Sequence, residues 1–480
     1  MAHFLSKARC VGSCIVPLAL WSWITPPVFS QVTVLEVGPH GTYATIQGAI
    51  DIVVNGADTE IRVERDVTYN ENLEVPDTFD SGSLEILGGW DATFSTRDLD
   101  PKKTVIDGGS AIGSVIEIDI EGGSLLVDGF TLTNGRTTGA GIQLSPDPGA
   151  NTSKVVIRNN RIEGNVANVY PVALGGGILA EPRGTQRLEI VDCRIRGNTA
   201  SSWNDGSALG GGIFLETRND STFLIEDCEI DGNSVTSEGG ERHGAGVHLR
   251  TSDSSKGMFY DSSVFGNSIL GTGTSKGSGG VLEISLSSSM EVARTGWAAN
   301  EVDAGDATPQ LVTISDWGPS SFRLTDSGIG LGDDGGLAVT AASSATVHLV
   351  NLTVVDNPGT GILASQEESS PVAIYNTIAF RNGTNLSTSG TVDAGSNLIG
   401  VDPLFVDGLS ISDRYYLRPG SPAENAGDNN PPGGLGTTDR DGRPRIIDGT
   451  VDIGMYEGII VVFVDGFETG DTTSWTSATP

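Results

Sequence analysis

The sequence is poor in lysine, histidine and cysteine, and each shortage excludes a class of protein. Its 480 residues include only 28 Lys and Arg against 61 Asp and Glu, which gives a net charge of −33. Such a charge leaves no positive surface for nucleic acid or for an anionic membrane. The 4 cysteines are too few for a disulfide-scaffolded fold, and the 5 histidines lack metal-binding spacing such as HExxH. We therefore expect no nucleic-acid partner and no cofactor, with calcium as the one alternative.

Hydrophobic runs of membrane-spanning character are missing beyond the start of the chain. Residues 1–30 combine two positive charges, a mostly apolar run at 10–24 and small residues before Gln31, which is typical of a secretory signal peptide. A retained anchor is the alternative, but the run is short for a bilayer span and prolines interrupt it. Cleavage leaves two cysteines, Cys193 and Cys228, and a net charge of 26 − 61 = −35. We expect a secreted or outer-surface protein with no integral membrane segment.

What the chain does contain is a repeat of segments that end in asparagine. VVIRNNRIEGN is followed by LEIVDCRIRGN, FLIEDCEIDGN and GMFYDSSVFGN, and the final Asn falls at Asn165, Asn198, Asn233 and Asn267, with weaker copies at Asn300, Asn357 and Asn382. The long gap before Asn357 predicts a degenerate copy around residues 322–325. Such a period indicates a solenoid or a propeller.

Alternation within each copy separates these two architectures. Apolar residues recur three, eight and ten positions before the Asn, as at Ile162, Ile157 and Val155, while positions two and four before it are mostly charged. Short strands with one buried face have this pattern, and a second, glycine-led strand such as GGGILAE follows in each copy. Propeller blades would need antiparallel hairpin signals. We therefore predict an all-β, right-handed parallel β-helix, in which equivalent strands of successive coils pair.

Two further features of the repeat have structural interpretations. The repeat Asn tolerates left-handed backbone geometry, and its amide can bond to the Asn of the next coil, so we expect a ladder rather than a ligand site. Cys193 and Cys228 both lie five residues before the Asn, on adjacent coils. Stacked side chains on parallel strands rarely have the dihedral that a disulfide needs, so we expect buried, unlinked thiols.

Both ends of the chain resemble known families. Residues 41–75, followed by LEILGGW, resemble the opening of secreted pectin-lyase-like right-handed β-helix proteins, although DVTY replaces the usual Gly-Thr-Tyr turn. This resemblance implies a short N-terminal capping helix, whose buried face would carry Ile46, Ala49, Ile50 and Val53. Residues 402–457 resemble the choice-of-anchor Q domain that closes many bacterial surface β-helix proteins, and the tail resembles DGFESGD-type endings of exported proteins.

These patterns define a domain organisation. Residues 1–30 form the signal peptide, 31–398 the β-helix, 399–458 a C-terminal capping module, and 459–480 a terminal strand with a sorting tail. Capping is a physical necessity for a solenoid, whose end coils otherwise expose apolar surface and unpaired strand edges.

The resemblance raises the hypothesis of a polysaccharide lyase or glycoside hydrolase, but the motifs are missing. The nearest approximations to the hydrolase segments are Asp333–Asp334 and Arg242–His243–Gly244, and no Arg-x-Pro-x-x-Arg lyase segment occurs. Asp439-x-Asp441-Gly442 begins like a calcium loop and lacks the downstream Glu. Catalytic residues therefore stay unknown. We favour a non-catalytic protein that contacts extracellular polysaccharide or a cell-envelope component as a monomer, with the enzyme as the alternative.

The binding hypothesis depends on one group of charged surface residues. The alternation predicts a mixed-charge strip on three consecutive coils, formed by Arg161, Glu163, Arg194, Arg196, Glu229 and Asp231. Arginines and carboxylates in such a strip could hydrogen-bond an extended glycan. The alternative is a solvated face in which opposite charges offset one another.

Overall fold

The computed structural model describes residues 32–77, 79–109, 112–145, 151–302, 308–316, 318–368, 371–406 and 415–458. The predicted signal peptide and the predicted terminal strand and tail lie outside these ranges. Within them, the chain is almost entirely β-structure, with one α-helix, α1 (Ile46–Ile50), and one 3-10 helix, η1 (Pro101–Lys103). None of the helices in these ranges is long and apolar enough to cross a membrane.

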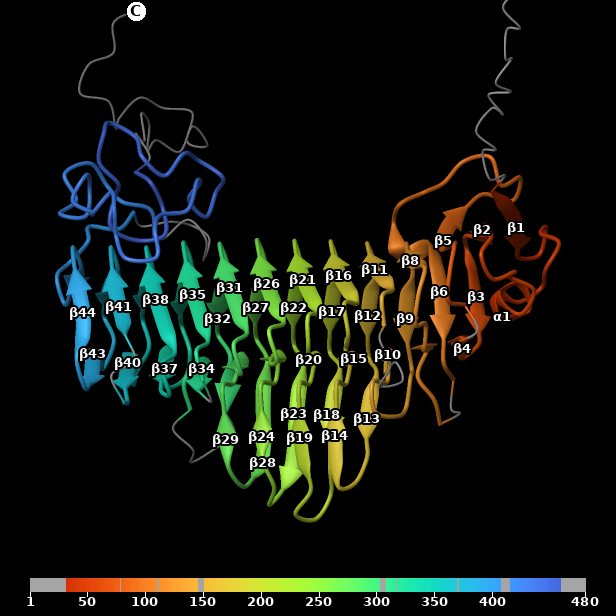
Figure 1. Cartoon of the computed structure of the whole chain (residues 1–480), viewed down its shortest axis with the longest axis horizontal. Coiled ribbons are helices and arrows are strands. Elements are labelled where there is room, and N and C mark those ends of the chain that lie inside the picture. Colours follow the sequence, from red (N-terminus) through yellow and green to blue (C-terminus); the bar gives the residue numbers. More distant parts are fainter. Residues whose placement is uncertain are drawn as a thin grey trace, which may run out of the picture. The chain divides into compact units, whose positions relative to one another are not determined.

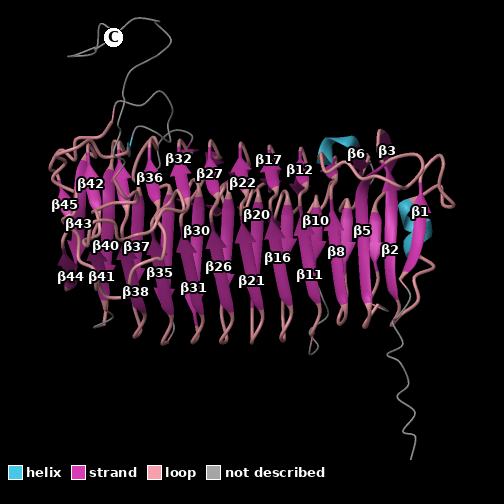
Figure 2. Cartoon of the chain, turned by 90° about the horizontal axis from the view of Figure 1, so that it is seen from above, coloured by secondary structure: helices cyan, strands magenta, loops and turns pink. Residues whose placement is uncertain are grey.

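Three long parallel sheets run through the described part of the chain, and each coil passes from sheet A to sheet B to sheet C (Figures 1 and 2). Sheet A contains β1 (Thr33–Val37), β2 (Asp58–Glu64), β5 (Ser83–Trp90), β8 (Ser124–Asp128), β11 (Lys154–Arg158), β16 (Arg187–Val191), β21 (Thr222–Glu226), β26 (Lys256–Tyr260), β31 (Ser289–Ala293), β35 (Ser321–Thr325), β38 (Thr346–Val350), β41 (Val372–Tyr375) and β44 (Val392–Gly395). Sheet B contains β3 (Val67–Asn70), β6 (Thr104–Asp107), β9 (Thr131–Thr133), β12 (Arg161–Glu163), β17 (Arg194–Arg196), β22 (Glu229–Asp231), β27 (Ser263–Phe265), β32 (Gly296–Ala298), β36 (Gly328–Gly330), β39 (Thr353–Val355), β42 (Ile378–Phe380) and β45 (Leu398–Ile399). Sheet C contains β4 (Leu73–Val75), β7 (Ile116–Ile118), β10 (Ile142–Leu144), β15 (Ile178–Ala180), β20 (Ile213–Thr217), β25 (Val247–Thr251), β30 (Gly280–Ser285), β34 (Leu311–Asp316), β37 (Leu337–Ala341), β40 (Thr360–Gln366) and β43 (Thr384–Ser389).

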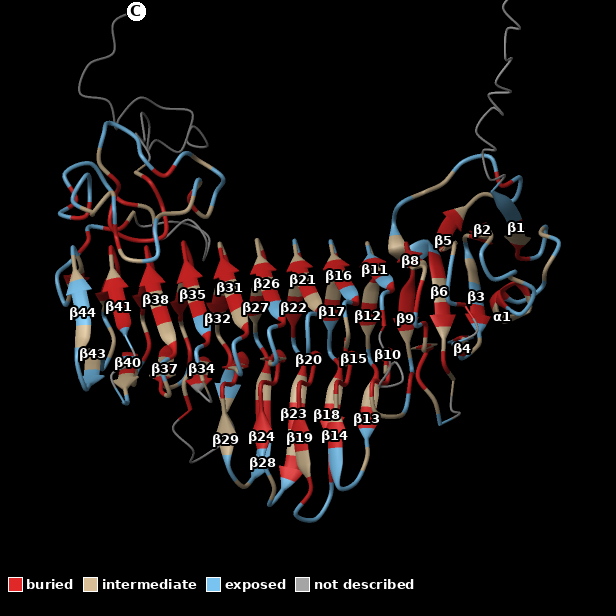
Figure 3. Cartoon of the chain, in the orientation of Figure 1, coloured by how far each residue is buried: buried red, intermediate tan, exposed pale blue. Residues whose placement is uncertain are grey.

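The predicted alternation sets the register of these sheets. Ile162 of β12 pairs with Ile195 of β17, which pairs with Ile230 of β22, and all three side chains are buried. Their charged neighbours on either side face outward. Burial therefore follows the interior of the coils (Figure 3), and the predicted right-handed parallel β-helix is confirmed.

The repeat asparagines form the expected ladder inside the coils. Each Nδ2 donates to the Oδ1 of the next Asn, at 3.0 Å from Asn165 to Asn198, 3.0 Å from Asn198 to Asn233 and 3.0 Å from Asn233 to Asn267. The expectation that the repeat Asn itself adopts left-handed backbone geometry is wrong, however. The residue before the Asn has the positive φ, as at Gly197 and Gly232, because the Asn must turn its amide inward.

The long gap in the repeat contains the degenerate coil that the spacing predicts, on β35, β36 and β37. This coil has no Asn in the ladder column. Gln310 takes its place: its Oε1 accepts from Asn300 Nδ2 at 3.0 Å, and its Nε2 donates to Asn357 Oδ1 at 3.0 Å. The longer glutamine side chain thus keeps the hydrogen-bond column continuous across the missing asparagine.

Two small lateral sheets were not predicted. Sheet D contains β13 (Val166–Asn168), β18 (Thr199–Ser201), β23 (Ser234–Glu238), β28 (Ser268–Thr272) and β33 (Glu301–Val302), and sheet E contains β14 (Val172–Leu174), β19 (Ser207–Leu209), β24 (Arg242–His243) and β29 (Ser275–Lys276). They project from the coils between sheets B and C (Figure 1). Their shared core is built largely from alanines, such as Ala173 and Ala208, which lack the bulky apolar pattern that marks a strand.

The N-terminal end of the coils is capped as the resemblance implied. Ile46, Ala49 and Ile50 of α1 are buried, and Val53 packs against the same core. Thr45 is the N-cap, because its Oγ1 accepts from the backbone N–H of Gly48 at 3.1 Å. The helix thereby covers the apolar end of the first coil.

Cys193 and Cys228 are buried free thiols on adjacent coils. Their Sγ atoms approach backbone carbonyls, for example Cys193 to Val191 at 3.3 Å and Cys228 to Glu226 at 3.2 Å. Ser262 of the next coil uses the same position for a hydroxyl that accepts from the Cys228 N–H. The two thiols therefore occupy a column of small hydrogen-bonding side chains at the corner between sheets A and B.

Candidate functional site

The six residues of the predicted mixed-charge strip lie together on the outward face of sheet B. Arg161, Arg194 and Glu229 are neighbours in one row, and Glu163, Arg196 and Asp231 are neighbours in the other row. Their strands, β12, β17 and β22, are consecutive in the sheet. The period-two alternation was therefore sufficient to place all six side chains on one face. Whether they bind a ligand stays a prediction.

Ion pairs within the strip join its arginines to its carboxylates. Arg161 pairs with Glu163 at 2.5 Å, and Arg194 lies 3.2 Å from both Glu229 and Asp231. The hydrogen bond to Asp231 raises the pKa of Arg194. Arg196 also contacts Asp231 at 3.2 Å. Because positive and negative side chains pair, the net charge of the strip is close to zero, as the solvated-face alternative requires. The same ion pairs hold several hydrogen-bond donors and acceptors in fixed positions.

Two side chains of the strip remain open to solvent. The Arg196 side chain is 52% exposed and that of Glu229 is 43% exposed, whereas Asp231 is only 7% exposed between them. Asp231 therefore acts as the buried anchor of the strip. Arg196 and Glu229 are the most exposed groups of the strip, followed by Arg194 and Glu163 at 32% each.

Beyond the strip, the outward face of sheet B becomes small and apolar. The register places Ser263 beside Glu229 and Phe265 beside Asp231, and the next two strands carry only Gly or Ala at the outward positions. An open cavity of about 320 Å³ lies here. Its lining comprises Ser263, Phe265, Gly296, Trp297, Ala298, Ala299, Gly328, Ile329, Gly330, Leu331, Thr353, Val355, Tyr415, Arg440, Met455 and Tyr456. Sequence reasoning missed this cavity.

Because the outward positions of β32 and β36 carry only glycine or alanine, the C-terminal module, residues 415–458, comes close to sheet B and forms the far wall of the cavity. A Cβ at Gly296 would lie 2.5 Å from Nη2 of Arg440, and a Cβ at Gly328 would lie 2.6 Å from Sδ of Met455. A side chain at either position would therefore force Arg440 or Met455 to move. The two glycines, at positions where other coils carry Arg or Glu, were the signal in the sequence that something packs against this face.

The C-terminal module is attached to sheet B by apolar contacts and backbone hydrogen bonds. Tyr415, Met455 and Tyr456 share a buried cluster with residues of β39, β42 and β45. The Met455 N–H donates to Thr353 Oγ1 at 3.0 Å, and the Gly454 N–H donates to the Asn376 carbonyl at 2.8 Å. The module thus packs against the outward face of sheet B over the last coils. Its role as the cap of the coil end and its identity as a choice-of-anchor Q domain stay predictions.

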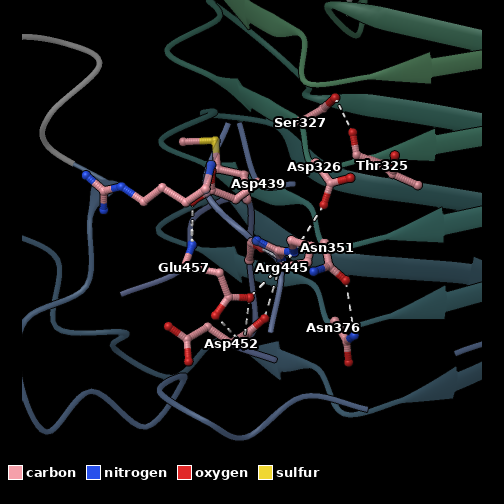
Figure 4. Close-up of polar contacts among 12 residues, drawn as sticks. Thr325, Asp326, Ser327, Asn351, Asn376, Asp439, Arg445, Asp452 and Glu457 are labelled. Atoms are coloured by element: carbon pink, nitrogen blue, oxygen red, sulfur yellow. Dashed lines mark hydrogen bonds and ion pairs between the residues drawn. The ribbon is translucent and has the colours of Figure 1, made fainter. Parts of the chain in front are cut away.

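A buried ionic junction lies where the module meets the coils (Figure 4). Nε of Arg445 lies 3.3 Å from Asp326 and 3.6 Å from Glu457, and all three residues are at most 2% exposed. Arg445 Nη2 also donates to the Gly454 carbonyl at 2.5 Å. One buried guanidinium therefore holds together a turn of the β-helix, after β35, and two segments of the module.

Burial strongly changes the protonation of this junction. It raises the pKa of Asp326 to about 6 and that of Glu457 to about 8, against the opposing charge of Arg445. Glu457 is therefore mainly protonated at neutral pH, and Asp326 is the carboxylate that balances Arg445.

The raised pKa of Glu457 predicts a pH-dependent stability. Because the folded pKa is above the unfolded value, the contribution of this carboxyl is fully present below about pH 4 and is lost as the pH rises through about 8. Relative to a Glu457→Gln variant, the wild type should lose several kcal/mol of unfolding free energy over this window, since each unit of pKa difference contributes about 1.4 kcal/mol. Urea titrations at several pH values measure the difference. The control is Glu424→Gln, an exposed carboxyl of the same module, whose curve should parallel the wild type; parallel curves for Glu457→Gln would contradict the assignment.

The other residues that the sequence singled out do not assemble into a site. Asp439 accepts backbone N–H groups from Asp441, Arg443 and Glu457 at 2.9, 2.8 and 2.9 Å. Whether calcium binds here stays a prediction. No group of His, Cys, Asp and Glu with metal-binding geometry occurs within the described ranges. Asp333 accepts from the Val302 N–H at 2.8 Å in a surface turn.

His243 and His248 are buried side chains of β24 and β25. Their ring centroids lie 5.8 Å apart, under the lateral sheets, and His248 also lies 5.4 Å from the Phe214 ring. Burial lowers the pKa of His243 to about 3, so its imidazole is neutral, and burial also lowers the pKa of His248, whose Nε2 lies 3.6 Å from Glu283. These histidines pack as part of the fold between sheets C and E, as ordinary strand residues.

A family model agrees with this geometry at the level of the fold. The family model of the right-handed beta helix region matches residues 102–294. A solved structure described as pectate lyase Pel9A is 14% identical and covers 90% of this chain and 98% of its own, with a TM-score of 0.43. The search of curated proteins found no match. The chain is a right-handed parallel β-helix.

Proposed function

We propose that the protein binds an extended polysaccharide without cleaving it, along the outward face of sheet B, outside the cell. The observation that carries the proposal is continuity: the ion-paired strip on β12, β17 and β22 meets the cavity at β27 without interruption. Hydrogen-bonding groups beside an aromatic and apolar surface are what sugar rings require, because each ring has polar edges and apolar faces.

Charge supports a polymer of low net charge and favours binding over catalysis. The strip contains three arginines and three carboxylates, and the chain as a whole carries −33, so a polyanion would be repelled. Each carboxylate of the strip already pairs with an arginine. A general acid or base must instead be free to exchange its proton with a substrate.

The proposal is tested by titrating neutral and uronate polysaccharides into the mature protein by calorimetry. Substitution Arg196→Ala or Phe265→Ala should weaken binding of the preferred neutral polymer about tenfold, because each removes a contact on the strip or at its junction with the cavity. Arg187→Ala is the matched control, since its side chain is 62% exposed on sheet A. Its affinity should equal that of the wild type.

Two outcomes would contradict the proposal. Equal loss of affinity in Arg187→Ala and Arg196→Ala would remove sheet B as the binding face. Sustained release of reducing ends or of unsaturated, ultraviolet-absorbing products would instead establish the alternative, a hydrolase or lyase.

A further inference from the structure

The cavity beside the C-terminal module is lined mostly by aromatic and aliphatic side chains. Its lining includes the aromatic rings of Phe265, Tyr415 and Tyr456 and several aliphatic side chains. Arg440 is the one charged residue among the described residues that line it. A volume of about 320 Å³ lies at the small end of ligand pockets and matches a single ring rather than a chain of sugars.

Arg440 lacks the anionic partner that the other arginines near sheet B possess. Arg194 and Arg445 both face carboxylates, whereas no ion pair of Arg440 occurs within the described ranges. Its Nη1 is buried and has no hydrogen-bond partner there. The Tyr456 ring lines the same cavity.

Such an arrangement is costly in the empty state. A partly desolvated guanidinium beside apolar rings loses hydration and gains little in return. An anion placed in the cavity would restore a charge-assisted contact, and a carboxylate matches the planar guanidinium well. The apolar walls, in turn, disfavour a small hydrated anion and favour an apolar body attached to it.

We propose that this cavity binds the ring of an aromatic monocarboxylate, with the carboxylate directed to Arg440 and the ring against the aromatic and aliphatic walls. This inference rests on the proposed function, because the ligand would be an acidic aromatic substituent of the bound polysaccharide. The cavity adjoins the strip at Phe265, so one polymer can occupy both. The pocket therefore selects which decorated polysaccharides the protein retains.

The probe is sodium 4-hydroxycinnamate, titrated into the full mature chain by calorimetry, with its neutral amide as the comparison. We expect the acid to bind at least about tenfold more tightly than the amide. Arg440→Met should remove this difference. Ala298→Leu, which fills the cavity, should abolish binding of both probes, and circular dichroism and unaltered binding of the undecorated polymer at the strip confirm that each variant is folded.

Several results would overturn the inference. Equal affinity for acid and amide in the wild type would exclude the role of Arg440, and unchanged binding in Ala298→Leu would exclude the cavity. Tighter binding after deletion of residues 459–480 would identify the tail of the chain as the natural occupant. Failure of the proposed function can be told apart from failure of this inference. If the probe binds and no polysaccharide does, the proposed function is wrong and the ligand pocket stands. If polysaccharide binds and the probe does not, only the ligand pocket is wrong.

Discussion

Replacement of Arg445 by methionine is expected to lower the free energy of unfolding by about 3–5 kcal/mol. The substitution removes the cation from Asp326, which is 0% exposed, and leaves the Gly454 carbonyl without its donor. Buried charge that has lost its partner is among the most destabilising changes in a protein interior. Urea unfolding at neutral pH measures the loss, and limited proteolysis should show earlier cleavage within the C-terminal module than within the coils.

The matched variant removes the charge together with its partner. Asp326→Asn combined with Arg445→Met should recover most of the lost stability, because a neutral amide costs far less to bury than an isolated carboxylate. An unfolding midpoint of the single Arg445→Met variant equal to that of the wild type would show that the junction does not hold the module.

The second large effect is expected from Asn233→Ala, in the middle of the ladder. Asn233 Nδ2 donates to the Ile195 carbonyl at 2.9 Å and to Asn267 Oδ1 at 3.0 Å. Its Oδ1 accepts from the backbone N–H and the Nδ2 of Asn198, both at 3.0 Å. Truncation leaves these groups buried without partners, so we expect a loss of about 3–5 kcal/mol in urea unfolding.

Asn168→Ala is the control for the ladder, because Asn168 lies exposed on β13 and belongs to no amide column. Its unfolding free energy should change by less than about 0.5 kcal/mol. If Asn233→Ala instead kept its stability and lost polysaccharide binding, the column would be a ligand site and its structural interpretation would be wrong.

The repeat made the candidate strip predictable. Apolar positions such as Ile162 and Ile195 specify the inward face, and strict alternation then assigns their neighbours to the outward face. Since each coil pairs with the next at a constant spacing, the relative position of Arg194 and Glu229 followed from counting residues to the repeat Asn. Gln310 escaped this counting because it joins the ladder from a different place in its coil.

The cavity and the ionic junction could not be predicted in the same way. Arg440 and Arg445 belong to a segment without repeat, so no period relates them to Gly296 or Asp326. The glycines indicated that a partner approaches the sheet, but many segments would satisfy that condition. Shape complementarity between the module and the coils selects the partner, and it depends on the whole packed surface.

The sequence by itself determined the parallel coils, the ladder and the outward strip, because each depends on spacing within a repeat and on contacts with the adjacent coil. The lateral sheets D and E, the cavity of about 320 Å³ and the position of Arg440 in its wall were decided only by the tertiary structure. They arise where side chains far apart in the sequence approach one another, and such contacts depend on three-dimensional packing rather than on local pattern.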